Sequence, residues 1–185
     1  MSKKSKQNKF LKQAFNTALY FLFIFAVTAF VLKFVGQRSV VDGSSMCDTL
    51  YDGESLWVNK FTYRFNQPER FDIIIFPYEH KEDTYFIKRI IGLPGETVRI
   101  DEEGTIYING EKLDENYGRE VISADSRGIA AEEIQVGEDE YFVMGDNRNN
   151  SMDSRYPNVG NIKKDAIIGK AVFRLFPLSK FGKIE

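Results

Sequence analysis

The chain has 185 residues, of which 43% are hydrophobic and 28% are charged, and its formal net charge is −2. This balance argues against a nucleic-acid partner, because nucleic-acid-binding domains present a strongly basic surface. A single cysteine, Cys47, excludes an intramolecular disulfide, and a single histidine, His80, leaves no Cys/His cluster for a zinc site.

The first predicted element is an uncharged apolar segment over residues 14–32. A helix of this length spans about 28 Å, close to the hydrocarbon thickness of a bilayer. A cleaved signal peptide is the alternative, but its apolar region would be shorter and would end at small residues, which this segment lacks. We therefore expect a basic tail over 1–13 and an uncleaved transmembrane anchor over 14–35.

Lysines crowd the N-terminal side of this segment. The ones that precede it are Lys3, Lys4, Lys6, Lys9 and Lys12. Only Lys33 and Arg38 follow closely. Because positive charge near a membrane span stays on the cytoplasmic side, we expect a single-pass protein of the cell membrane with a cytoplasmic N-terminus and an extracytoplasmic domain over 36–185.

Beyond the anchor, the chain predicts short strands separated by turns. The predicted strands are 71–76, 97–100, 105–108, 140–144 and 171–176. Asn109 and Gly110 form a strong two-residue hairpin signal. Residues 114–135 are compatible with a flexible excursion or with a short helix near 130–134. The pattern predicts a mainly β domain, a largely antiparallel folded sheet or barrel.

Three short motifs carry residues suited to catalysis. A Gly-Ser-Ser-Met run at 43–46 presents Ser45, Lys88 lies in an apolar strand pattern, and residues 145–155 form a polar loop. Serine needs a base to take its proton, and lysine is such a base when burial lowers its pKa. Each motif alone also fits a structural role: a turn, an edge-strand lysine that prevents aggregation, and a loop fixed by ion pairs.

Two other candidate groups fit catalysis less well. His80 lies in the polar run 77–83, which is typical of an exposed turn, so a histidine-dependent triad is not expected. Cys47 would need an activating partner to become a thiolate, and none is evident in the sequence. Ser45 therefore remains the favoured nucleophile.

Taken together, the three motifs resemble those of bacterial type I signal peptidases, the membrane-bound serine/lysine proteases that remove signal peptides. The resemblance runs from the anchor to Phe181, weakens between about 112 and 136, and is most specific at 41–46, 88–96 and 145–155. It implies a largely antiparallel β fold, no metal or organic cofactor, and cleavage after small residues of the Ala-x-Ala type. Its implied partners are signal peptides of exported preproteins and the lipid bilayer.

The same resemblance implies a role for individual residues. Ser45 matches the nucleophile, Lys88 the general base, and Ser151 the serine that orients the lysine amine. The positions that shape the site through hydrogen bonds and ion pairs are Arg89, Asp146, Asp153, Ser154 and Arg155. The positions that line the small apolar substrate pockets are Val41, Met46, Leu50, Phe86 and Ile87.

The sequence departs from the family pattern at two positions. Asp48 stands where the family usually has proline, and a carboxylate near Lys88 would raise the pKa of that amine; we expect Asp48 to point away. Gly43 stands where some relatives have a serine that donates to the oxyanion. The backbone N–H of Ser45 would then carry this role, with a second donor unidentified.

Two other functions remain open at this point. One is a serine/lysine protease that cuts itself or one dedicated substrate, like the self-cleaving SOS repressors, although those are cytosolic and carry a DNA-binding domain. The other is a membrane-tethered β module that binds exported peptides without cutting them, which only the Asp48 departure favours.

Overall fold

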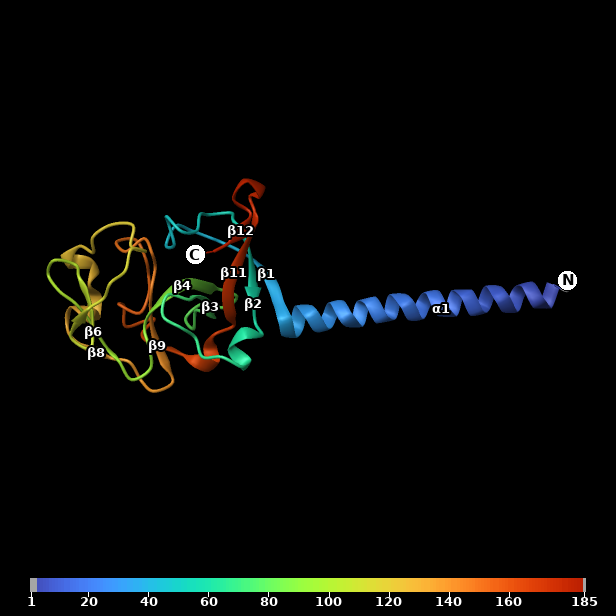
Figure 1. The fold of residues 1–185 in the computed structure, drawn as a ribbon, viewed down its shortest axis with the longest axis horizontal. Helices are drawn as coiled ribbons and strands as arrows, with labels where there is room; N and C mark the ends of the chain where they lie inside the picture. The colour runs from blue at the N-terminus through green and yellow to red at the C-terminus, as the bar shows by residue number, and fades with distance from the viewer. Residues whose placement is uncertain (1–2, 185) are drawn as a thin grey trace. The chain divides into compact units, whose positions relative to one another are not determined.

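The computed structural model describes the backbone of residues 3–184 and the side chains of residues 9–184. The chain divides into two compact units, with the boundary after Gly36. The first unit is the helix α1 (Lys3–Phe30), which continues as a π-helical turn, Val31–Val35 (Figure 1). The helix therefore begins well before the predicted anchor and includes lysines of the basic tail.

The segment Lys9–Val35 is the one candidate membrane span in the described part of the chain, by length and composition. Its aromatic side chains are exposed, for example Phe23 at 68% and Phe25 at 72%. A helix that is apolar on all sides and unburied has the surface expected of a lipid-facing segment.

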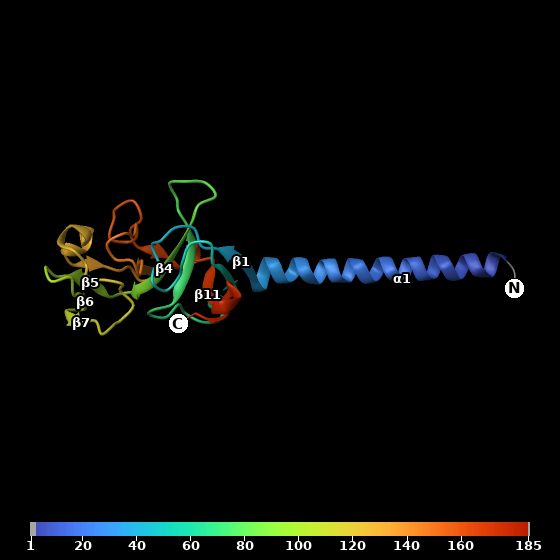
Figure 2. The same cartoon turned by 90° about the horizontal axis from the view of Figure 1, so that it is seen from above.

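The second unit is built on two sheets (Figures 1 and 2). The larger sheet has the order β1-β2-β11-β3-β4-β9-β10, and β12 pairs with β11. Its strands are β1 (Gly36–Val40), β2 (Ser55–Asn59), β3 (Ile73–Pro77), β4 (Tyr85–Gly92), β9 (Glu140–Met144), β10 (Ile162–Lys163), β11 (Gly169–Phe176) and β12 (Gly182–Lys183). The pairings along β3, β4 and β9 are antiparallel, which confirms the predicted fold class.

The smaller sheet lies at one end of this domain in both views (Figures 1 and 2). Its strands, in spatial order, are β7 (Glu111–Lys112), β6 (Ile106–Ile108), β5 (Thr97–Ile100) and β8 (Ile134–Gln135). Asn109 and Gly110 both have positive φ, 51° and 79°, as a type I′ turn requires. The predicted hairpin is therefore confirmed.

Single helical turns occupy several connections of the second unit. These 3₁₀ turns are Thr62–Arg64, Ala124–Ser126, Gly128–Ala131, Lys164–Ala166 and Leu178–Lys180. The alternative of a short helix near 130–134 is confirmed only in part, because a single 3₁₀ turn spans Gly128–Ala131 and β8 begins at Ile134. The neighbouring backbone is tied to the polar loop, since the Ile129 N–H donates to the Arg155 carbonyl at 2.8 Å.

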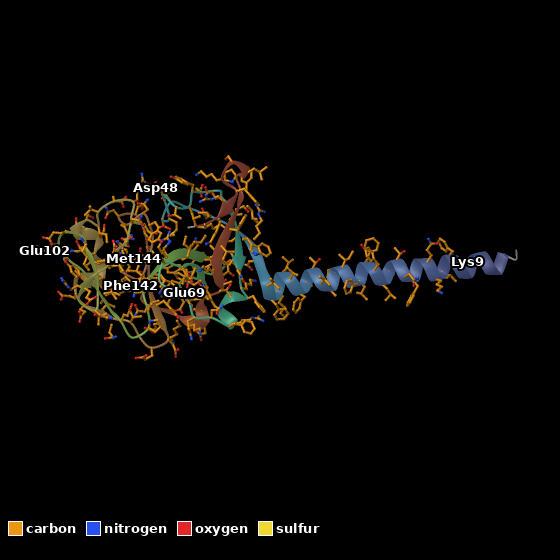
Figure 3. All side chains as sticks on the ribbon, in the orientation of Figure 1. Lys9, Asp48, Glu69, Glu102, Phe142 and Met144 are labelled. Carbon is orange, nitrogen blue, oxygen red and sulfur yellow. The ribbon has the colours of Figure 1, made fainter. Side chains whose placement is uncertain are left out.

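Strand β4 connects the hydrophobic clusters of the domain. Ile91 packs in a cluster with Phe142 and Met144, whose side chains lie inside the domain (Figure 3). Ile90 packs in a second cluster, and Ile87 lies against a third, which contains Met46. Because successive residues of a strand face opposite sides, one strand supports all three clusters and is held firmly in place.

The predicted strand 71–76 begins two residues late, at Ile73. Phe71 has a positive φ of 72°, which no strand residue adopts. The Asp72 carboxylate accepts hydrogen bonds from the Tyr63 hydroxyl at 2.8 Å and the Glu69 N–H at 3.1 Å. Phe71 and Asp72 thus form a fixed turn that leads into β3.

Candidate active site

The predicted nucleophile lies in a tight turn that follows β1. Gly43 has a φ of 94°, and its N–H donates to the Asp52 carboxylate at 2.8 Å. The side chain of Met46 is only 1% exposed, and the Leu50 N–H donates to the Met46 carbonyl at 2.8 Å. The turn is therefore anchored on the core and presents Ser45, which is partly exposed, at the surface.

Lys88 projects from the middle of β4 and is 3% exposed. Its Nζ lies 2.7 Å from Ser45 Oγ and 3.0 Å from the Ile87 carbonyl oxygen, and 5.0 Å from the ring centroid of Phe86. The structure thus brings together the serine and the lysine that the resemblance paired.

Burial lowers the pKa of Lys88 from 10.5 to about 8, because the low-dielectric surroundings disfavour the ammonium. The carboxylates of Asp153 and Asp146 act in the opposite direction, and Arg155 adds to the lowering. At pH 8, about half of these amines are neutral and able to accept a proton.

Asp48 does not reach this amine. Its side chain is 63% exposed and lies at the outside of the domain (Figure 3). It contacts Tyr51 at 3.3 Å and Arg119 at 3.8 Å. The prediction that Asp48 points away from Lys88 agrees with this geometry.

The first ion pair beneath the site joins β4 to the polar loop. Arg89 donates to both oxygens of Asp146, at 2.9 and 2.7 Å, and both side chains are almost fully buried. Thr49 donates to the same carboxylate at 2.5 Å, and Arg89 also donates to the Phe71 carbonyl at 3.0 Å. This pair fixes the strand residue next to Lys88 against the turn that carries Ser45.

The second ion pair lies within the loop itself. Arg155 binds Asp153 through two nitrogens, each at 2.8 Å, and both side chains are fully buried. The same carboxylate accepts the Gly145 N–H at 2.9 Å, and Ser154 Oγ accepts the Val143 N–H at 2.9 Å. The five predicted supporting residues thus form buried hydrogen bonds that fix the polar loop and join it to β4 and β9.

Ser151 is placed close to the site but not on the amine. Its Oγ is buried and has no hydrogen-bond partner in the described part of the chain. The Lys88 amine donates to Ser45 and to the Ile87 carbonyl instead. A role of Ser151 in orienting the amine therefore stays a prediction.

A cavity of about 410 Å³ opens beside the dyad. It is lined by Ser39, Val40, Val41, Asp42, Ser45, Met46, Lys81, Asp83, Thr84, Tyr85, Phe86, Ile87, Lys88 and Met152. Four of the five predicted pocket residues are among them. Leu50 is not, because it is fully buried in the cluster behind Met46.

Sequence reasoning missed the loop between β3 and β4, which projects from the domain and contributes Lys81 and Asp83 to the cavity (Figure 2). It also missed Met152, although this residue directly follows Ser151 in the polar loop. The position of Met152 within that motif was the signal that could have identified it.

One edge of β4 is open next to this cavity. On one side, β4 pairs with β3 from Tyr85 to Arg89. On the other side, β9 pairs only from Arg89 onward, so the described strands leave residues 85–88 unpaired there. Such an edge presents backbone donors and acceptors to an extended peptide.

Comparison with known proteins identifies relatives over most of the chain. Residues 14–176 match the family described as signal peptidase, peptidase S26. Signal peptidase I T of Bacillus subtilis (strain 168) is 37% identical, covering 99% of this chain and 98% of its own length. Signal peptidase I of Bacillus licheniformis is 38% identical over 89% of this chain and 90% of its own.

A crystal structure of a signal peptidase I from Enterococcus faecalis V583 is 37% identical and has a TM-score of 0.46, covering 57% of this chain and 97% of that one. The family match extends from the apolar helix through β11, and so includes the nucleophile turn, β4 and the polar loop. The chain therefore belongs to the signal peptidase family, peptidase S26, and is a serine peptidase.

Proposed function

We propose that this protein is a membrane-anchored endopeptidase that removes N-terminal signal peptides from exported preproteins with a Ser45/Lys88 dyad. The observation that carries the proposal is the 2.7 Å contact between Ser45 Oγ and an amine that is 3% exposed. A lysine whose role was only to prevent aggregation at a strand edge would point to solvent. A serine whose role was only to form a turn would not need a buried base beside it.

In the first half of the reaction, neutral Lys88 takes the proton of Ser45 as the hydroxyl attacks the scissile carbonyl. The lysine, now an ammonium, protonates the leaving amine, which departs as the N-terminus of the mature protein. In the second half, neutral Lys88 activates a water molecule that releases the acyl group from Ser45. The 2.7 Å contact supports direct transfer of the proton.

The backbone N–H of Ser45 supplies one donor for the oxyanion. Among the hydrogen bonds of the described residues, none is donated by this N–H. An N–H that is free and fixed on a rigid turn stabilises negative charge without reorganising during the reaction.

The substrate would bind as an added strand along residues 85–88. Alternate side chains of an extended peptide then point into the cavity, about 6.6 Å apart. The cavity wall near the dyad is made by Val41, Met46, Phe86 and Ile87. A cavity of about 410 Å³ shared by two side chains and the peptide backbone favours small residues at the cleavage site, as in Ala-x-Ala.

We further propose that residues 14–35 anchor the enzyme in the cell membrane and that the catalytic domain over 36–185 lies outside. The exposed apolar helix supports the anchor. The lysines that precede it, including Lys9 and Lys12, support a cytoplasmic N-terminus.

Replacing either member of the dyad tests this proposal. We expect Ser45→Ala, Lys88→Ala and Lys88→Arg each to lower cleavage of a labelled preprotein by roughly 10³-fold or more, because arginine stays charged and alanine carries no base. Circular dichroism should show an unchanged fold. Ser179→Ala and Lys112→Ala, at exposed positions, serve as matched controls that should cleave normally.

The same assay separates the rival functions. A self-cleaving protease would produce one internal cut when the purified protein is incubated alone. A binding module would retain peptide without turnover and would be insensitive to Ser45→Ala. Full activity of Lys88→Ala would overturn the assigned base.

A further inference from the structure

We propose that Asn147 is a positioning residue that aims the nucleophile turn, and that residues 115–123, here called the clamp, hold Asn147 in place. This inference rests on the proposed function of Ser45. It concerns a different part of the site, because Asn147 does not line the cavity and contacts neither the Lys88 amine nor the Ser45 hydroxyl.

Asn147 forms hydrogen bonds to the peptide groups on both sides of the nucleophile. Its N–H donates to the Ser45 carbonyl at 3.0 Å, and its Nδ2 donates to the Ser44 carbonyl at 3.1 Å. Asn147 is 7% exposed, so these hydrogen bonds compete little with water. Because both peptide planes are fixed, the backbone dihedral angles of Ser45 are fixed as well. The position of its Cβ atom, from which the hydroxyl extends, follows from them.

The second of these bonds also aims the oxyanion donor. The Ser44 carbonyl and the Ser45 N–H belong to the same peptide group, and in a planar trans peptide they point in opposite directions. When Asn147 holds the carbonyl toward the polar loop, the Ser45 N–H is turned away from the loop. The Ser44 carbonyl also accepts the Cys47 N–H at 3.1 Å, so Asn147 acts together with the turn itself to orient the Ser45 N–H.

The residues that flank Asn147 also form hydrogen bonds and an ion pair with the clamp. The Arg119 N–H donates to the Asp146 carbonyl at 2.9 Å, and Arg148 pairs with Glu115 at 2.7 Å. Asn149 exchanges three hydrogen bonds of 2.9 Å with Glu120, Val121 and Ser123. Asn147 alone in this run directs both its N–H and its Nδ2 to the nucleophile turn.

The Glu115–Arg148 ion pair joins the clamp to the residue that follows Asn147. The side chain of Arg148 is 2% exposed and that of Glu115 is 12% exposed. A Cβ added at Gly118 would lie 3.2 Å from Arg148 Cζ, so the clamp backbone approaches the guanidinium closely. Arg148 Nε and Nη2 are buried and have no hydrogen-bond partner in the described part of the chain, so Glu115 supplies the carboxylate that compensates this buried charge.

Steady-state kinetics with two inhibitors tests the role of Asn147. A peptide aldehyde ending in alanine forms a hemiacetal with Ser45 that needs the aimed hydroxyl and N–H, whereas the matching alcohol binds by the peptide strand alone. For Asn147→Ala we expect kcat to fall by about tenfold or more with KM within about twofold. The affinity of the aldehyde should fall by a factor similar to the fall in kcat, while the affinity of the alcohol should not change.

The clamp is tested by Glu115→Gln, which removes the charge and keeps the shape. We expect a fall in kcat of about fivefold, smaller than for Asn147→Ala, because the effect passes through Asn147. The double variant should then be no slower than Asn147→Ala alone, since the two changes act on the same contact. Glu111→Gln, at an exposed position on β7, is the matched control and should behave as the unaltered protein.

Several results would overturn the inference. Unaltered kcat in Asn147→Ala, or equal losses of aldehyde and alcohol affinity, would exclude positioning of the nucleophile. Additive losses in the double variant would exclude the clamp. If Asn147→Ala does not fold, Asn147→Asp keeps the side-chain size and removes the Nδ2 donor. Failure of the unaltered enzyme to cleave any preprotein would instead count against the proposed function.

Discussion

At the scale of single residues, the reactivity of the site depends on the balance of charge around Lys88. Burial lowers the pKa of this amine, and the carboxylates of Asp153 and Asp146 limit the lowering. Both carboxylates are paired with buried arginines, which reduces their influence. The amine can therefore be neutral near physiological pH and still regain a proton during each cycle.

A pH profile of cleavage follows from this balance. In the proposed mechanism the neutral Lys88 amine is the base, so kcat/KM should rise about tenfold per pH unit in the acidic range and level off above a midpoint near pH 8. Initial rates on a short peptide between pH 6 and 9.5 measure this midpoint. A profile that is flat or that falls across this range would contradict a lysine base.

Asp48→Asn provides the control for this profile. The Asp48 carboxylate faces solvent and contacts Arg119, so removing its charge should leave the midpoint unchanged. A clear acid shift of the midpoint in this variant would mean that Asp48 reaches Lys88 during the reaction.

The dyad could be predicted from sequence because its residue types are unusual in their surroundings. A lysine within an apolar strand and a serine after glycine in a motif can both be recognised as candidate catalytic residues. Asn147 and Glu115 could not be predicted in this way, because asparagine and glutamate are ordinary in polar loops. Their significance comes from contacts with Ser44 and Arg148, which are distant in the sequence.

At the scale of elements, β4 contributes side chains both to the hydrophobic core and to the candidate active site. Its apolar pattern predicted a strand, and its contacts with three clusters explain why the position of Lys88 is fixed. Strand β1 was not predicted, because Gln37, Arg38 and Ser39 interrupt any alternation of apolar residues. Leu50 was assigned to a pocket because sequence does not distinguish an apolar residue lining a pocket from one buried just behind it.

The end of β4 gives a prediction about stability. A Cβ added at Gly92 would lie 2.6 Å from Val98 Cγ2 and 3.0 Å from Phe142 Cβ. Gly92→Ala should therefore destabilise the domain by ~1–3 kcal/mol through overpacking, seen as a lower midpoint of thermal unfolding in detergent.

The double variant Gly92→Ala/Val98→Ala tests this cause. Removing the Val98 methyl group that is in conflict should restore part of the loss. If the double variant is less stable than Gly92→Ala by the full cost of a lost valine, the clash is not the cause.

At the scale of the whole molecule, the chain joins an apolar helix to a β domain that contains the whole dyad. The helix was predicted from composition alone, since few other segments are free of charge over a bilayer thickness. The N-terminal limit of the helix was not predicted, because the lysines of the tail are themselves good helix formers and extend the helix to Lys3.

Removing residues 1–35 separates the two functions of the molecule. The truncated protein should cleave a short soluble peptide at an unchanged rate, because the dyad and the cavity lie within the second unit. It should cleave a preprotein embedded in vesicles about 10²-fold more slowly, because it lacks the proposed anchor that would concentrate the enzyme at the membrane. Equal losses on both substrates would show that the helix supports the fold of the domain.

The open edge of β4 also affects what happens after the bond is cut. In the proposed binding mode, a signal peptide along residues 85–88 would be held through its own backbone on the amino-terminal side of the cleavage point, and hydrolysis would not break those hydrogen bonds. The mature chain would then dissociate first, whereas the cleaved signal peptide would remain bound along β4 and exclude the next preprotein. Turnover would then be governed by how fast the leader slips back into the lipid, and an excess of leader peptide would act as a competitive inhibitor.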